Sequence, residues 1–285
     1  MISNKILVLI INALMVMSPL LAGEATDRNH RKPKSVPLLL QFNIAADLVV
    51  VGKVEQVTRP PTTTGGYEVV MITIDRVIAA VSNQVDVGLI QTNATSKPII
   101  VLQKLPLSHR AAEFISGGQY LCWLEAFQPS EEEVRAMGLS SSRTYTPVTR
   151  INMYGNSAPG VVLLSPYKEV LRDKEYQMMQ KTLGKDPEWY QERNMKDAFG
   201  VTNATELVEA TSRSAGLMIK GKDTEQELDL LSRSENKTYS KMATVLRELG
   251  MNARRFDFVD AVKPTRVTPA RNATHSAAGG REKRE

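Results

Sequence analysis

The stretch Asp47–Val57, DLVVVGKVEQV, has the composition of a β-strand and, toward its end, the alternation of one. One face holds apolar residues and a glycine, namely Leu48, Val50, Gly52 and Val54. The opposite face turns polar near the end of the strand, at Lys53 and Glu55. A short amphipathic helix over Val36–Ala46 leads directly into this strand, and the turn-rich segment Arg59–Gly66, RPPTTTGG, forces a loop after it.

A series of further short strands follows. Tyr67–Ile78, YEVVMITIDRVI, alternates clearly, with Val70, Ile72 and Ile74 on one side. The other candidate strands are Val85–Ile90, Ile99–Gln103, Gln119–Phe127, Tyr145–Tyr154 and Val161–Leu164. Because no crossover helices intervene, the pattern predicts an antiparallel sheet that closes or nearly closes on itself. The predicted fold class is α+β, with an antiparallel OB-like β-barrel followed by a helical C-terminal region and a disordered tail.

The order of these segments resembles a known family. The succession ADLVVVGKV, YEVVMITIDRVI, FISGGQYLCWLEAF, and INMYG before GVVLLS is similar to bacterial exported domains built as an OB-type barrel, the netrin-like or tissue-inhibitor-of-metalloproteinase fold. The resemblance covers about residues 36–165, under half of the chain. The positions of the family's first-strand and fourth-strand patterns are held here by Asp47, Gly52, Phe114, Gly117, Tyr120, Leu121 and Leu124.

The resemblance implies a fold and a set of structural roles. Gly52 is expected to permit a bend or a close approach of two backbones, and Gly117 a turn. Eukaryotic inhibitors of this fold chelate a protease zinc ion through a disulfide-bonded cysteine at the mature N-terminus. This chain has no cysteine there, so that inhibitory mechanism does not carry over.

The second half of the chain is predicted to be helical. The expected helices are Pro166–Leu183, Pro187–Phe199 after Asp186, Ala204–Lys220 capped by Asn203, one that begins near Thr224, and Lys237–Leu249. Their apolar faces are thin, which predicts loose packing on the barrel or on one another. From Lys263 onward Pro, Thr, Ala, Gly and charged residues dominate, which is typical of a disordered segment.

The first residues of the sequence have the features of a secretory signal peptide. Lys5 precedes the apolar run Ile6–Met17, Pro19 breaks the helix, and small residues follow, so cleavage is expected after Ala22, Gly23 or Ala25. An uncleaved anchor is the alternative, since Ile6–Ala22 reaches the lower limit of about 17 residues for a membrane span. No cysteine follows that would allow lipidation. The product is predicted to be extracytoplasmic, either periplasmic or secreted, with no stable membrane insertion after cleavage.

These features give a predicted organisation in five parts. They are a signal peptide (1–23), a flexible N-terminal linker (24–35), an OB-like β-barrel domain (36–165), a helical region (166–262) and a disordered basic tail (263–285).

The positive charge of the chain lies outside its predicted folded part. The formal net charge is +5, of which residues 263–285 carry +4, residues 24–34 carry +2 and Lys5 carries one. Residues 35–262 therefore have a net charge of −2. Together with an aromatic content of 6%, this argues against a nucleic acid as the partner.

Cys122 is the single cysteine of the chain, so an internal disulfide is impossible and the fold depends on its core. Within Gln119–Phe127 it shares a strand face with Tyr120, Leu124 and Ala126. A buried structural thiol is the favoured interpretation. An intermolecular disulfide or a reactive nucleophile would require an exposed side chain.

The sequence holds no recognisable catalytic, cofactor or metal motif, so none is predicted. Of the three histidines, His30 and His275 lie in the predicted flexible ends and His109 in a loop without a paired nucleophile or carboxylate. Ser157 lies in a sequence similar to a nucleophile elbow, but Pro159 replaces the last glycine, which favours a turn residue. The acidic run Glu131–Glu133 is interpreted as a solvated helix start.

Three classes of function remain open. The leading hypothesis is an exported, non-enzymatic binding or interaction protein, with an unknown protein or glycan partner in the cell envelope. Its expected contact surface is the pair of loops Arg59–Gly66 and Leu105–Gly118. The alternatives are a protease-inhibitor-like protein, by analogy of fold, and an enzyme with an unrecognised site that gathers His109 and buried carboxylates.

Overall fold

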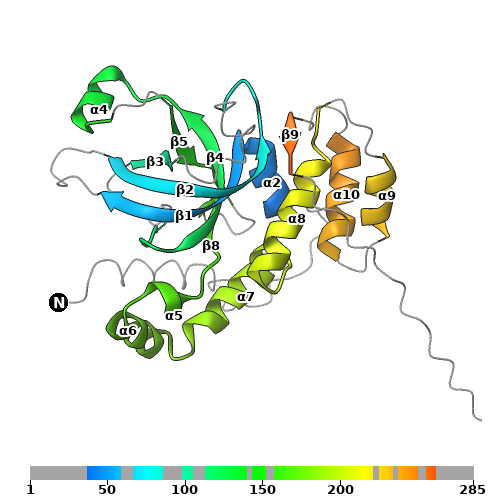
Figure 1. Ribbon diagram of the computed structural model, residues 1–285. Coiled ribbons are helices and arrows are strands. Elements are labelled where there is room, and N and C mark those ends of the chain that lie inside the picture. Colours follow the sequence, from blue (N-terminus) through cyan, green and yellow to red (C-terminus); the bar gives the residue numbers. More distant parts are fainter. Residues whose placement is uncertain are drawn as a thin grey trace, which may run out of the picture.

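The computed structural model describes residues 37–58, 67–85, 98–104, 113–139, 143–151, 157–220, 225–233, 237–249 and 255–260. The barrel is built from β1 (Leu48–Thr58), β2 (Tyr67–Ala80), β3 (Pro98–Lys104), β4 (Gln119–Phe127) and β5 (Thr144–Pro147). These strands follow the order β1-β2-β3-β5-β4, and β4 pairs back with β1 to close the barrel (Figure 1). The predicted signal peptide, linker and basic tail lie outside the described residues, as does the predicted strand at 85–90 beyond Val85.

The barrel is mixed, so the prediction of a purely antiparallel sheet is wrong. β5 pairs antiparallel with β4 and parallel with β3, where Val101 faces Tyr145. The physical reason is the number of strands. Because directions cannot alternate all the way around a closed ring of five, at least one neighbouring pair must run in parallel. The predictions of an α+β fold and of a barrel are confirmed, and this barrel is compatible with an OB-like one.

The two faces of the barrel wall belong to different cores. The barrel interior is filled from all five strands by residues such as Val50, Ile72, Val101, Cys122 and Tyr145. The outer face of β1 and β4 packs instead against helices, through Val49, Val51, Leu121 and Trp123. Both strands are consequently buried on both faces, which explains why the start of β1 is continuously apolar.

Two glycines have the roles that the resemblance implies. A Cβ atom on Gly52 would stand 2.7 Å from the Ile72 Cγ2 atom and 2.7 Å from the Thr73 carbonyl oxygen. Pairing between β1 and β2 shifts register beside it, between Val51 and Gly52, so the strands approach closely at an irregular point. Gly117 has a φ of 86°, in the left-handed region that favours glycine, and lies in the turn before β4.

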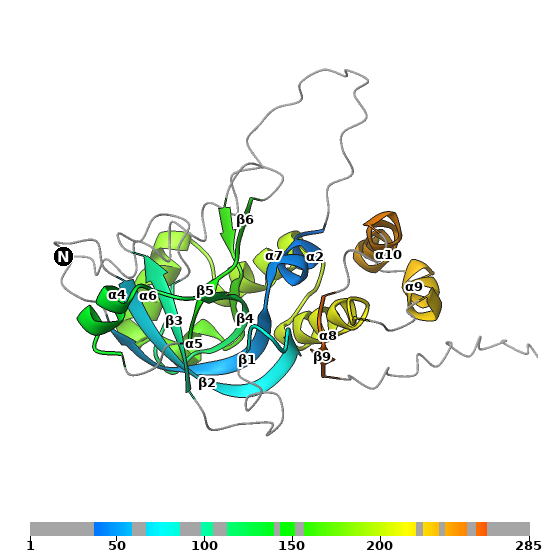
Figure 2. The same ribbon diagram turned by 90° about the horizontal axis from the view of Figure 1, so that it is seen from above.

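Helices cover one side of the barrel and extend away from it. The described helices are α2 (Leu38–Ala45), α4 (Glu131–Ala136), α5 (Tyr167–Val170), α6 (Asp173–Leu183), α7 (Pro187–Phe199), α8 (Ala204–Gly216), α9 (Glu225–Ser232) and α10 (Lys237–Leu249). Figures 1 and 2 place α9 and α10 on the far side of α8 from the barrel. None of the helices in the described ranges is long and apolar enough to cross a membrane.

The helices pack more tightly than their thin apolar faces predict. Leu207 and Ala215 of α8 and Met242 of α10 have no exposed surface, and they share one core cluster with Trp123 of the barrel. That cluster also includes Phe42 of α2. The expectation of loose packing is therefore wrong, because the apolar residues of these helices are fully buried in one core shared with the barrel.

The helix predicted over Pro166–Leu183 is two helices. Leu171 and Arg172 between them are extended, with ψ of 148° and 151°. The second helix, α6, begins anew because the Glu175 carboxylate accepts a hydrogen bond from the Arg172 backbone N–H at 3.3 Å. Leu171 then packs with Tyr167 against a small separate core.

A short segment near the C-terminus returns to the barrel. This strap, residues 255–260, contains β9 (Phe258–Val259), which pairs antiparallel with Ala79 and Ala80 of β2. Phe256 is fully buried and forms a parallel bridge with Ile219 just after α8. The strap thus adds a strand to the barrel wall, in a region predicted as helical.

Three further strands complete the sheets. β8 (Val161–Leu163) confirms the strand predicted there and pairs with β4, and β6 (Thr149–Ile151) and β7 (Ser157–Pro159) form a second, two-stranded sheet. Ser157 opens β7, so its interpretation as a turn residue is wrong. Its backbone pairs with Ile151 across this small sheet.

Candidate functional site

A polar pocket of about 370 Å³ lies beside the corner between β4 and β5. Its walls are the turn after β2, the end of β4 and the start of β5. The lining residues are Asn83, Gln84, Ala126, Phe127, Gln128, Arg143, Thr144 and Tyr145. Its volume is within the range of about 300–1,000 Å³ that is usual for small-molecule sites.

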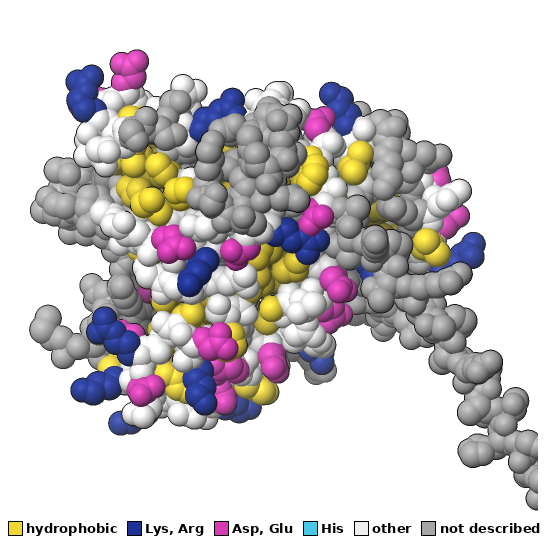
Figure 3. Space-filling model, in the orientation of Figure 1, with side chains coloured by type: hydrophobic (Ala, Val, Ile, Leu, Met, Phe, Trp, Pro, Cys, Tyr) yellow, Lys and Arg dark blue, Asp and Glu magenta, His cyan; other side chains and the backbone are white. Residues whose placement is uncertain are grey.

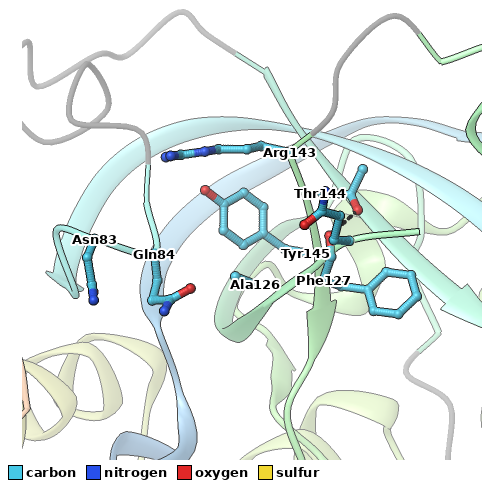
Figure 4. A pocket seen from close by; sticks show the side chains of 8 residues that line it. Asn83, Gln84, Ala126, Phe127, Arg143, Thr144 and Tyr145 are labelled. Atoms are coloured by element: carbon cyan, nitrogen blue, oxygen red, sulfur yellow. Dashed lines mark hydrogen bonds between the residues drawn. The ribbon is translucent and has the colours of Figure 1, made fainter. Parts of the chain in front are cut away.

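The strand wall of the pocket is held by pairing between β4 and β5. Phe127 faces Thr144 and Ala126 faces Tyr145 in the ladder, and the Thr144 hydroxyl donates to the Phe127 carbonyl at 2.7 Å. Tyr145 is only 2% exposed, with its ring in the barrel core. Figure 4 shows the tip of Arg143 and the hydroxyl of Tyr145 both on the side of the pocket where Asn83 and Gln84 lie.

The turn wall of the pocket is fixed by the strap. The Asp257 carboxylate accepts two hydrogen bonds from Ser82, from its backbone N–H at 2.9 Å and from its hydroxyl at 2.7 Å. The turn itself is closed by the Gln84 N–H, which donates to the Val81 carbonyl at 3.0 Å. Asn83 and Gln84 therefore stand on a turn whose position depends on residue 257.

The same strap also reaches the strand wall. Arg255 forms an ion pair with Asp47 and donates to the Ile44 carbonyl at 2.7 Å. The second carboxylate oxygen of Asp47 accepts from the Ala126 N–H at 2.9 Å, next to the pocket. Asp47, which the resemblance singles out, thus joins the end of β4 to the strap. The turn wall is thus anchored by a residue 175 positions away in the sequence, and the strand wall by one 79 positions away.

The hydrogen bonds from Ser82 lower the pKa of the Asp257 carboxyl, first through the hydroxyl and then through the backbone N–H. A depressed folded-state pKa stabilises the fold above the unfolded value of about 3.9, and this contribution is lost as the pH falls through the folded pKa. We expect the gap in urea midpoint between wild type and Asp257→Ala to stay constant from pH 7 to about pH 5 and to shrink below pH 4. The urea midpoint of Ser82→Ala, which retains the N–H donor, should lie between those of wild type and Asp257→Ala. A gap that does not change between pH 6 and pH 3 would contradict this role.

The residues that the sequence singles out as candidates for function are not in the described lining of this pocket. The loop 59–66 and residues 105–112 of the second predicted contact loop lie outside the described residues, as do all three histidines. Cys122 is buried inside the barrel, and this burial raises the pKa of its thiol well above the ordinary value, which confirms the structural interpretation. Glu131–Glu133 begin α4, as predicted, and Ser130 and Glu133 form a capping box at its start.

Sequence reasoning missed the pocket because its three walls come from separate segments without a motif. The available signal was modest: Arg143, Thr144 and Tyr145 combine a cation, a hydroxyl and an aromatic ring at the start of a short strand.

The described surface carries charges of both signs. On the face shown in Figure 3, acidic and basic side chains are interspersed over the described surface. Within the described ranges, no three His, Cys, Asp or Glu side chains are grouped so that they could hold a metal ion. The polar side chains exposed at the pocket are therefore three amides and one guanidinium, while Thr144 and Tyr145 behind them are buried.

Comparison with known proteins adds no relative. No protein-family model matches the chain, and no curated protein matches its sequence.

Proposed function

We propose that this protein is an exported, non-enzymatic binding protein, and that the pocket at the β4–β5 corner is where it holds a small polar ligand of the cell envelope. The observation that carries the proposal is the composition of the pocket. Three exposed amide side chains, Asn83, Gln84 and Gln128, line it together with Arg143. Such groups recognise a ligand by directional hydrogen bonds.

The chemistry of the lining favours binding over catalysis. General acid–base and nucleophilic catalysis use imidazole, carboxylate, thiol, amine, hydroxyl or phenol groups. Of these, the eight described lining residues hold only the Thr144 hydroxyl and the Tyr145 phenol, and the Tyr145 side chain is buried. The Thr144 hydroxyl is already engaged with the Phe127 carbonyl.

The anchoring of the walls supports the same function. A binding site gains affinity when its groups are held in place before the ligand arrives. Here the strap holds the turn through Asp257 and the end of β4 through Arg255 and Asp47. The backbone of the two walls therefore needs little ordering when a ligand binds.

The barrel type and the compartment belong to the proposal as well. We infer a netrin-like OB barrel from the positions of Asp47, Gly52 and Gly117 within the family pattern, together with the closed five-stranded ring. Export is inferred from the signal sequence. The protease-inhibitor alternative draws on the barrel alone, without a specific contact that favours it.

The test is a binding screen with a matched pair of variants. Ligand-observed NMR on the full chain, with a panel of monosaccharides and N-acetyl dipeptides, should identify a binder. Gln84→Ala should then weaken its affinity about three- to tenfold, because a neutral hydrogen bond contributes about 0.5–1.5 kcal/mol. Gln177→Ala, at an exposed position of α6, should bind as the wild type does. Failure of the whole panel to bind, or equal binding by Gln84→Ala, would refute the proposal.

A further inference from the structure

Asp47 connects both walls of the pocket to the strap. Its backbone N–H donates to the Leu124 carbonyl at 2.8 Å, and its carboxylate accepts from the Ala126 N–H at 2.9 Å, so it holds the end of β4. Its own carbonyl accepts from the Val81 N–H at 2.9 Å, at the start of the turn after β2. The other carboxylate oxygen pairs with Arg255 of the strap. The strap therefore contacts a residue that is bonded to both walls.

The strap has a second contact with the turn wall. The Asp257 carboxylate accepts from the N–H and the hydroxyl of Ser82, which directly precedes the lining residues Asn83 and Gln84. Hydrogen bonds to a charged group are stronger than those between neutral groups, so each of these contacts can hold a wall in place. Arg255 and Asp257 thus join the strap to the two supports of the pocket.

A different set of contacts keeps the strap itself on the fold. The Phe256 side chain is fully buried, and its backbone N–H donates to the Met218 carbonyl at 3.0 Å. Asp260 pairs with Arg76, and its carbonyl accepts from the Ser212 hydroxyl at 3.0 Å. None of these residues is among the described lining residues of the pocket. The contacts that dock the strap can therefore be changed separately from those that reach the pocket.

We propose that docking of the strap and binding of a ligand in the pocket are reciprocally coupled, with Arg255 and Asp257 as the coupling residues. This coupling rests on the proposed binding function and describes how that site is regulated. With both contacts formed, the turn and the end of β4 are held where they bind the ligand. Without them, the pocket binds more weakly. The ligand must in turn favour the docked strap by the same factor, because coupling between two sites is reciprocal. Asp257 is a positioning residue, since its carboxylate acts through Ser82.

Exchange of backbone amides in the ligand-free protein tests how the strap holds the walls. It is followed by NMR on the full chain at the amides of Gln84 and Ala126, neither of which donates to the strap. Asp257→Ala should speed exchange at Gln84, and Arg255→Gln at Ala126, each at least about fivefold, the lower end of the usual range for coupled sites. Asp260→Ala removes a carboxylate of the same strap and should leave both amides at the wild-type rate, because that side chain pairs with β2 ahead of the turn.

The ligand that the screen identifies tests the coupling itself. Asp257→Ala and Arg255→Gln should each raise its Kd at least about fivefold, whereas Asp260→Ala should bind as the wild type does. The strap amides of Asp257 and Asp260 donate to the carbonyls of Ala80 and Ile78. Saturation with the ligand should slow exchange of these two amides in the wild type, and should not slow it in a variant that carries both coupling substitutions.

The opposing outcomes separate this coupling from the binding function. Unchanged exchange at both wall amides, equal acceleration by Asp260→Ala, or wild-type affinity of Asp257→Ala and Arg255→Gln would each overturn the coupling and leave the binding function standing. A panel without a binder would remove the binding function and the coupling with it. Far-UV circular dichroism melts show that each variant folds. If Asp257→Ala does not fold, Ser82→Ala tests the same contact from its other side.

Discussion

Replacing Trp123 by alanine is expected to lower the free energy of unfolding by about 3–5 kcal/mol, the usual cost of deleting a buried aromatic side chain. Trp123 lies on the outer face of β4 with no exposed surface. Its ring stacks on Phe42 of α2 at 5.1 Å and on Phe199 of α7 at 5.9 Å between centroids. Small domains have about 5–15 kcal/mol of stability in total, so this loss is large.

The hydrogen bond of the Trp123 indole N–H adds to the expected loss of folding stability. The indole N–H donates to the Asn43 side-chain oxygen at 2.7 Å, and the Asn43 amide in turn donates to the Ser214 hydroxyl. Removing the indole leaves the acceptor on Asn43 buried and without this donor, which carries a desolvation penalty. The network joins β4, α2 and α8, so the variant should loosen the helices from the barrel.

Trp189 provides the matched control, since the chain has two tryptophans. It is 36% exposed on α7 and lies beside Lys185 and Arg193 at 4.0 and 5.1 Å from its ring centroid. Trp189→Ala should cost about 1–2 kcal/mol, given two contacts at about 0.5–1 kcal/mol for each exposed cation–π pair. Urea denaturation, monitored by far-UV circular dichroism, measures the stability cost of both substitutions. Equal costs for the two variants would contradict the shared core between barrel and helices.

Phe256→Ala is the second substitution with a large expected effect, again about 3–5 kcal/mol. The side chain has no exposed surface and belongs to the core that the helices share with the barrel. Its backbone is held on both sides, because its N–H donates to Met218 at 3.0 Å and its carbonyl accepts from Lys220 at 2.8 Å. Loss of the ring should detach the strap and, with it, both anchors of the pocket.

Phe258 is the control for the strap, two residues further along. It lies in β9 and is only partly buried against the barrel interior core. Phe258→Ala should therefore cost clearly less than Phe256→Ala in the same urea experiment, since less apolar area is lost. If Phe256→Ala costs under about 1 kcal/mol, a cost typical of sites away from any core, the strap does not hold the fold as described.

The strands of the barrel were predictable because their side chains alternate. The interior positions Val50, Ile72 and Cys122 were all assigned to one face of their strands from periodicity alone, and they share one core. The parallel pairing of β3 and β5 was not predictable in that way, since alternation specifies faces and not neighbours. Closure of an odd number of strands requires at least one parallel pair, but the strand order decides which pair it is.

The strap and the broken helix show where local patterns fail. β9 has two residues, too few for a period of two to be recognised. The break at Leu171–Arg172 lacks the Gly or Pro that usually marks a helix end, and it depends on packing of Leu171 in a separate core. Both features arise from contacts between distant segments.

The candidate site is the least predictable part of the molecule. Gln84, Gln128 and Arg143 belong to three segments that only the folded barrel and its strap bring together. Single polar residues in turns are common, so none of them is distinctive before the fold is known.

The most direct test of the central claim is a map of amide chemical shifts in the ¹H–¹⁵N spectrum of the wild-type chain, titrated with the saccharide or dipeptide that binds best. If the pocket is the binding site, the largest changes will fall on the amides of residues 83–84, 126–128 and 143–145, with smaller ones on the strap at 255–260. Changes confined to α7 around Trp189, or to any surface away from the β4–β5 corner, would contradict the account.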